Sequence, residues 1–204
     1  MATRKYEQRL RAETAEETRR RILDGVYRRL RAAPTQPVSI EQIARVARVA
    51  RSTVYLIFGS RAGLFDAVIG DLLQRGGFDR VITAVAHPDA REHLRQGIRA
   101  SADVFAVDRE VHRVLFSMAT IDPENAGGAM QRMEERRSGG MAYLARRLAE
   151  QGLLRSDVTE ADAAHILYLI TSFDSFDSLY TGRGLSVEEV ARLLVGMAER
   201  AVCH

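Results

Sequence analysis

Residues 39–58 read SIEQIARVARVARSTVYLIF, and this stretch decides how the N-terminal part of the chain folds. Ser39 followed three residues later by Gln42 is a capping box, a pattern that opens a helix. The apolar side chains behind it recur at helical spacing, at Ile40, Ile43, Ala44 and Ala47. A second short apolar pattern follows almost at once, at Val49, Val54 and Phe58. Two short helices within about twenty residues have the size of a helix-turn-helix.

The second helix of this pair begins with polar side chains, which are Arg51, Ser52, Thr53 and Tyr55. An arginine can donate two hydrogen bonds to guanine or hold a phosphate, and hydroxyl groups reach phosphates or base edges. Arg61 opens the following helix, where the positive helix N-terminus also favours a phosphate. The pattern therefore predicts a DNA-reading helix. The alternative is a three-helix packing unit whose polar face is only solvated.

The charge distribution favours the DNA-reading interpretation. The whole chain has a net charge of +3, but residues 1–65 contain 14 Lys and Arg against 6 Asp and Glu, a net charge of +8. The remaining residues carry a net charge of −5. A basic segment joined to a mildly acidic body indicates that one part of the chain meets a polyanion. The alternative explanation is an arginine-rich helix that is simply solvated.

Helical patterns continue on both sides of the motif. Thr14 with Glu17 forms a capping box that predicts a first helix, and Ser60 caps a helix that ends at Gly76-Gly77. Further helices are expected at about 89–107, 109–119, 126–152, 159–181 and 186–202. The chain is therefore predicted to be all-α with about nine helices. We expect a helix-turn-helix domain at 1–80, with its motif at about 39–58, and a larger helical domain at 81–204.

Length and composition exclude several classes of protein. A chain of 204 residues with 46% hydrophobic and 28% charged residues can bury a sizeable core, which excludes disorder over its whole length. No apolar run approaches the ~18 residues that a membrane helix needs, and no apolar leader follows the basic N-terminus. The lone Cys203 cannot form an internal disulfide. These features predict a cytoplasmic protein with no membrane partner.

The sequence gives no sign of a metal, cofactor or catalytic site. Asp89/His93, Asp108/His112 and Asp162/His165 are pairs at helical spacing, but a metal site needs three or four converging ligands. A nucleophile elbow, a phosphate-binding loop and a dinucleotide-binding glycine motif are all absent from the sequence. We therefore expect no metal, no cofactor and no enzymatic activity.

The stretch from Ile43 to Leu64 resembles the DNA-binding domain of the TetR family of bacterial regulators, and the resemblance extends over about Thr14 to Leu73. The family pattern has an Ile-Ala pair, a turn of small residues and a reading helix of the form Thr-hydrophobic-Tyr-x-x-Phe, followed by Lys or Arg and then Leu. The resemblance implies operator DNA as a partner. The residues expected to contact double-stranded DNA are Ser39, Arg48, Arg51, Ser52, Thr53, Tyr55 and Arg61.

Three departures from the family pattern bear on DNA affinity and sequence preference. Arg48 replaces a glycine in a turn that favours a left-handed backbone, and it could add a phosphate contact. Ala50 replaces a Ser or Thr, which removes a side-chain helix cap worth about 1 kcal/mol. Leu56 and Ile57 stand where polar, aromatic or basic residues often touch the DNA backbone.

The body of the chain resembles the family in length, in helicity and in its closing segment, Leu179 to Val190. The resemblance implies a ligand-responsive regulator, expected to be a repressor, that binds a near-palindromic operator as a homodimer. The dimer is expected to form through the last two helices, at about 159–202. Their apolar stripe supports this, at Leu169, Phe173, Phe176, Tyr180, Val187, Val190, Leu194, Met197 and Ala201.

The resemblance also implies a largely apolar small-molecule effector bound between helices of the body. Flexible and aromatic side chains suit such a pocket, although any of them can equally be ordinary core. The residues expected to line it are Phe105, His112, Phe116, Met118, Met133, His165, Tyr168 and Phe173. The alternative function is a dimeric small-molecule-binding module that has lost sequence-specific DNA binding, which Arg48, Ala50, Leu56 and Ile57 motivate.

Overall fold

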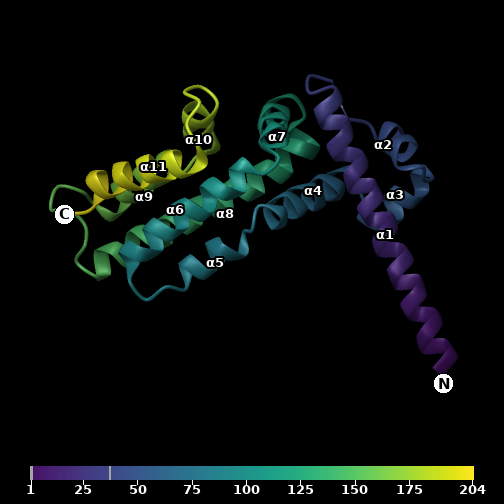
Figure 1. The fold of residues 1–204 in the computed structure, drawn as a ribbon, viewed down its shortest axis with the longest axis horizontal. Helices are drawn as coiled ribbons and strands as arrows, with labels where there is room; N and C mark the ends of the chain where they lie inside the picture. Colours follow the sequence, from purple (N-terminus) through teal and green to yellow (C-terminus); the bar gives the residue numbers. More distant parts are fainter. Residues whose placement is uncertain (1, 37) are drawn as a thin grey trace. The chain divides into compact units, whose positions relative to one another are not determined.

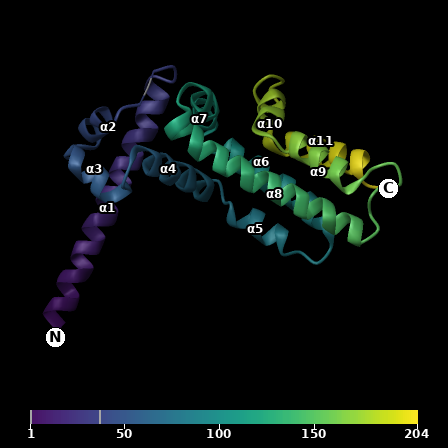
Figure 2. The ribbon, with the colours of Figure 1, turned by 180° about the vertical axis from the view of Figure 1, so that it is seen from behind.

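The computed structural model describes residues 2–36 and 38–204, and this part of the chain is helical, as predicted (Figures 1 and 2). The helices are α1 (Ala2–Ala32), α2 (Ile40–Ala47), α3 (Arg51–Phe58), α4 (Arg61–Arg75), α5 (Asp79–Val85), α6 (Ala90–Ala106), α7 (Arg109–Ile121), α8 (Gly128–Glu150), α9 (Glu160–Ile170), α10 (Phe173–Tyr180) and α11 (Val187–Val202). A π-helical turn, η1 (Pro123–Gly127), lies between α7 and α8.

The chain forms two compact units. The first contains the chain up to Ile69 together with Arg113–Ala129, and the second contains Gly70–His112 and Met130–His204. The helix-turn-helix thus belongs to a unit that also takes in a segment from the middle of the chain. The predicted functional division at residue 80 stays a prediction.

The core of the first unit is built where α1 packs on α2 and α4. Ile22, Val26 and Leu30 of α1 are fully buried, as are Phe65 and Val68 of α4. Tyr27 is buried as well, and its hydroxyl donates a hydrogen bond to the Val68 carbonyl at 3.3 Å. A buried phenol needs such a partner, so this bond fixes α4 against α1.

The predicted start of the first helix at Thr14 is wrong. The structure continues α1 back to Ala2, and within the helix the Thr14 carbonyl accepts a hydrogen bond from the Thr18 hydroxyl at 2.8 Å. Residues 2–13 contain neither Gly nor Pro, so nothing in that segment breaks the helical pattern. A capping motif therefore lies inside a longer helix.

The predicted count of about nine helices is too low, because α5 was not foreseen and the helix expected at 159–181 is two helices. The short α5 follows Gly76-Gly77 and has Phe78 at its N-cap, with no side-chain hydrogen bond to signal a start. Alpha-9 ends at Ile170, and the Ser172 hydroxyl then caps α10 by accepting from the Ser175 amide at 3.1 Å. Serine caps break a helix this way when they compete for backbone groups.

The second unit is organised around α6, against which α5, α10 and α11 pack. Gly76, at the start of the unit, lets the backbone approach α6 closely. A Cβ at this position would lie 2.6 Å from the Cα of Val104 in α6. Alpha-9 packs in turn on α11, and their buried side chains include Leu167, Val190 and Leu194. The arrangement brings side chains of α6, α10 and α11 into one core.

Candidate functional site

The helix-turn-helix predicted at 39–58 is present as α2 and α3. The capping box at its start forms as expected, because the Ser39 hydroxyl accepts from the Gln42 amide at 3.2 Å and the Gln42 side chain accepts from the Ser39 amide at 3.2 Å. Ser39 therefore has a clear structural role. Its predicted contact with DNA stays a prediction.

Arg48 forms the turn between the two helices in a left-handed backbone conformation, with φ 55° and ψ 48°. This confirms the prediction of a left-handed turn at a residue with a Cβ, which costs roughly 1–2 kcal/mol relative to a right-handed conformation. The Arg48 amide donates to the carbonyls of Ala44 and Arg45, and the Arg48 side chain is exposed. Ala50 caps α3 without a side-chain hydrogen bond, again as expected.

The outer face of α3 is formed by Arg51, Ser52, Tyr55 and Leu56, all of which are exposed. The Arg51 guanidinium donates to the Tyr55 hydroxyl at 3.3 Å and forms an ion pair with Glu41 of α2 at 2.7 Å. The hydrogen bond to Tyr55, with the nearby Glu41 carboxylate, raises the pKa of Arg51 above its ordinary value. An exposed ion pair of this kind contributes little to stability. Arg51 can therefore exchange Glu41 for a base or phosphate at small cost.

The inner face of α3 fixes the helix to the rest of the first unit. Val54 is buried with 1% exposure, while Val49 and Phe58 are half-buried. The Arg19 guanidinium of α1 lies 5.0 Å from the centre of the Phe58 ring. Thr53, predicted to contact DNA, is also half-buried, and its amide donates to the Ala50 carbonyl at 3.0 Å. The short α3 is thus held on one side and open on the other.

Arg61, predicted to hold a flanking phosphate, is paired inside the first unit. Its guanidinium lies 2.7 Å from the Asp122 carboxylate, and both side chains are partly buried. The start of α4 beside it is capped by the Ser60 hydroxyl, which accepts from the Gly63 amide at 3.0 Å. A phosphate contact by Arg61 would have to displace Asp122, so that contact stays a prediction.

Three of the residues predicted to line an effector site, Phe105, His112 and Phe173, meet in the second unit. The Phe105 ring lies 5.5 Å from both the His112 and the Phe173 rings, and the His112 and Phe173 rings stack at 5.6 Å. His112 is buried, with Nε2 3.2 Å from the Val104 carbonyl. Burial lowers the pKa of His112 from 6.5 to about 4, outweighing the hydrogen bond to Val104. The imidazole is therefore neutral at physiological pH.

The other predicted lining residues have different surroundings. The Tyr168 hydroxyl donates to Glu134 at 2.8 Å, and this hydrogen bond raises the pKa of Tyr168. The Arg137 guanidinium lies 3.8 Å from the centre of the Tyr168 ring. Met133 is half-buried and His165 is exposed. Phe116 and Met118 belong to the first unit, and their predicted part in an effector site stays a prediction.

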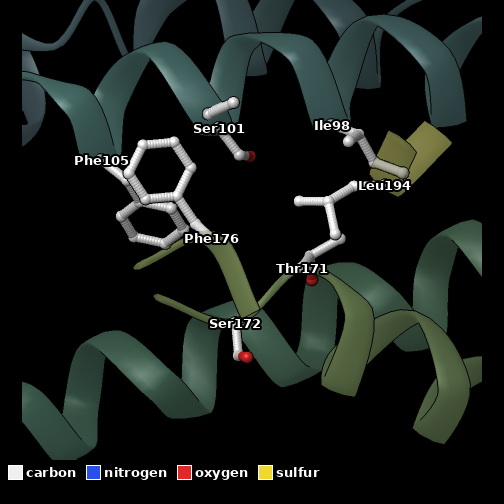
Figure 3. A pocket seen from close by; sticks show the side chains of 8 residues that line it. Ile98, Ser101, Phe105, Thr171, Ser172, Phe176 and Leu194 are labelled. Carbon is white, nitrogen blue, oxygen red and sulfur yellow. The ribbon is translucent and has the colours of Figure 1, made fainter. Parts of the chain in front are cut away.

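A small cavity opens between α6, α10 and α11 and the short link between α9 and α10 (Figure 3). It offers only about 10 Å³ of space to a molecule the size of water, and it is lined by Ile98, Ser101, Ala102, Phe105, Thr171, Ser172, Phe176 and Leu194. Phe105 is the one residue it shares with the predicted set. The sequence carried a signal for the part on α6, because Ile98, Ser101 and Ala102 recur with Phe105 at helical spacing and share one face of that helix.

Two negative findings hold for the part of the chain that the structure describes. It contains no group of three or more His, Cys, Asp or Glu residues that could hold a metal ion. Within the same residues, no helix is long and apolar enough to cross a membrane.

The chain shares its fold with solved structures of regulators. A TetR-family transcription regulator from Marinobacter aquaeolei is 17% identical with a TM-score of 0.65, over 94% of this chain and 98% of that one. A TetR transcription regulator from Haloarcula marismortui is 17% identical with a TM-score of 0.68, over 93% and 100%. A ketosteroid transcriptional regulator of Mycobacterium tuberculosis is 14% identical with a TM-score of 0.66, over 91% and 95%. At these identities the likeness shows the fold.

The region that contains the helix-turn-helix also matches a protein-family model. No curated protein sequence matches the chain. Residues 22–68, which include α2, α3 and the beginning of α4, match the model of the bacterial regulatory proteins of the TetR family. Through this region the chain has the DNA-binding domain of the TetR family of bacterial regulatory proteins.

Proposed function

We propose that this regulator is a ligand-responsive repressor that binds a near-palindromic operator as a homodimer and is released by a small, largely apolar effector. The observation that carries the DNA part is the open outer face of α3. Arg51 and Tyr55 are exposed there, while buried Val54 fixes the opposite side of the helix. Two such helices related by two-fold symmetry fit successive major grooves of a palindrome. A repressor of this kind acts in the cytoplasm, where bacterial DNA is found.

Replacement of Arg51 with alanine tests this assignment. We expect operator affinity to fall about 10- to 100-fold, the effect of losing one bidentate arginine contact with a base. An operator is first selected from random-sequence duplex DNA with the parent protein, and the affinities of both proteins are then measured by fluorescence anisotropy at fixed salt. The matched control is Arg183→Ala, which removes an exposed arginine from the second unit. Equal affinity of R51A and the parent protein would refute the assignment.

The alternative is a small-molecule-binding module that has lost sequence-specific DNA binding. It is favoured by the uncapped start of α3 at Ala50 and by Arg48 in its left-handed turn. The selection experiment separates the two functions, because such a module would enrich no sequence from the random pool. Electrostatic, sequence-independent binding would remain and would weaken steeply with salt.

The homodimer is proposed to form through α9 and α11, which pack on each other. Much of the stripe from which a dimer was expected is buried within the chain itself, including Phe173, Phe176, Val190 and Leu194. Two large apolar side chains on these helices are exposed, Leu169 of α9 with 69% exposure and Met197 of α11 with 47%. A second copy of the chain would remove these side chains from water.

Glutamate at both positions, Leu169→Glu with Met197→Glu, is expected to weaken the dimer at least tenfold, since each symmetric interface would bury four uncompensated carboxylates. Sedimentation velocity at micromolar concentration measures the change. Ile82→Glu serves as the control, because it places the same charge at an exposed apolar position on α5. A double variant that sediments as the parent protein does would place the interface elsewhere.

The effector is proposed to bind at the cavity between α6, α10 and α11. The lining is apolar except for the hydroxyl groups of Ser101, Thr171 and Ser172, which suits a small ligand with no net charge. The space that water could occupy is only about 10 Å³, far below the roughly 300–1,000 Å³ of most ligand pockets, so binding would require the surrounding helices to separate. An effector that binds better to the conformation with separated helices would shift the population toward it. If that conformation binds the operator less tightly, the effector releases the DNA.

A further inference from the structure

One leucine on the outer face of α3 has no structural explanation within the chain. Leu56 is 86% exposed, whereas Val54, two residues before it, is buried with 1% exposure. Full burial of a leucine side chain stabilises a protein by roughly 1.5–3 kcal/mol relative to leaving it in water, and Leu56 does not contribute this free energy to the fold. Leu56 follows Tyr55 directly and lies one helical turn after Ser52, so the three share the outer face.

The surroundings of Leu56 indicate what kind of partner would cover it. Arg45, Arg48 and Arg51 are exposed on α2, on the turn and at the start of α3. Glu41 is the acidic residue of these two helices, and it is already paired with Arg51. An apolar side chain among exposed arginines fits a polyanion that itself presents apolar groups. The major groove of DNA does so through the C5-methyl group of thymine.

We propose that Leu56 is a specificity-determining residue that recognises a thymine in the operator by packing on its C5-methyl group. The inference rests on the proposed function, because it requires α3 to enter the major groove. Leu56 lies five residues after Arg51, about 7.5 Å along a helix at 1.5 Å per residue. The two side chains also point about 140° apart around the helix, so the thymine is expected at a different base pair from the one that Arg51 reads.

The test replaces each thymine of the selected operator, one at a time, with uracil, which lacks only the methyl group. With the parent protein, one thymine position per half-site is expected to show a loss of about fourfold, the value of one buried carbon group. With Leu56→Ala the same replacement should have no effect, and its affinity for the unmodified operator should be at least fourfold below that of the parent protein. Leu56→Met, which keeps an apolar side chain of similar size, should retain the sensitivity.

Two controls keep the result interpretable. Ile82→Ala removes a different exposed apolar side chain, on α5, and must leave the uracil profile unchanged. Thermal melting checks that Leu56→Ala is folded, as expected for an exposed position. If uracil at each position lowers the operator affinity of the parent protein and of Leu56→Ala equally, the assignment of Leu56 is overturned. The assignment of α3 as the DNA-reading helix would stand. If the parent protein selects no sequence at all, the proposed function fails, and the role of Leu56 fails with it.

Discussion

Replacement of Phe176 with alanine is expected to lower the free energy of unfolding by about 3–5 kcal/mol, the range for large-to-small substitutions of buried aromatic residues. Phe176 has no exposed surface. Its ring stacks on Tyr180 with centres 5.2 Å apart and lies 5.8 Å from the Phe105 ring. It also forms one wall of the cavity (Figure 3), so the substitution would enlarge an existing space rather than let the core close around it.

Urea denaturation followed by circular dichroism, at a fixed protein concentration, measures this loss. The control is Tyr143→Ala, because Tyr143 is an aromatic residue of the same unit with 39% exposure and should cost much less. Phe176→Leu should fall between the two, since it leaves a smaller void. A Phe176→Ala protein as stable as the parent protein would show that the second unit relaxes freely into the space.

Acid is expected to destabilise the protein through His112, and the effect has a defined sign. The pKa of His112 is lowered from 6.5 to about 4 in the folded chain, because burial disfavours the charged imidazolium. Between these values the unfolded chain binds a proton that the folded chain does not, so stability falls as the pH falls from 6.5 to 4. The loss attributable to His112 is about 3 kcal/mol, and stability is fully retained above pH 6.5.

The measurement compares unfolding free energies at pH 7 and pH 4.5 for the parent protein and for His112→Gln, which cannot take up the proton. The variant is expected to lose less stability over this interval, whatever its stability at pH 7. The matched substitution is His165→Gln, which removes an exposed histidine of the same unit. The buried His93, whose pKa burial also lowers to about 4, accounts for part of the acid sensitivity that remains. Identical pH profiles for His112→Gln and the parent protein would contradict the prediction.

Several features that depend on neighbouring residues could be predicted from the sequence alone, although the local capping pattern at Thr14 did not mark the start of α1. The capping box at Ser39 joins groups three residues apart, and it forms as expected. The left-handed turn at Arg48 and the uncapped Ala50 are equally local. Helical spacing of apolar residues then determined the all-α class and the helix-turn-helix, because such spacing decides which face of a helix is buried. The outer face of α3, with Arg51 and Tyr55, could be predicted for the same reason.

Tertiary packing alone decided which distant residues share a core or an ion pair. Arg61 could not be assigned to Asp122 from the sequence, because the two lie far apart in the chain and meet only in the folded first unit. Phe173 and Phe176 looked like an outward stripe on a long helix, but the break at Ser172 turns them into the core beside Phe105. Helical periodicity predicts which face of a helix is apolar. Only the tertiary structure determines whether that face is covered by the same chain, by a ligand or by a second copy of the chain.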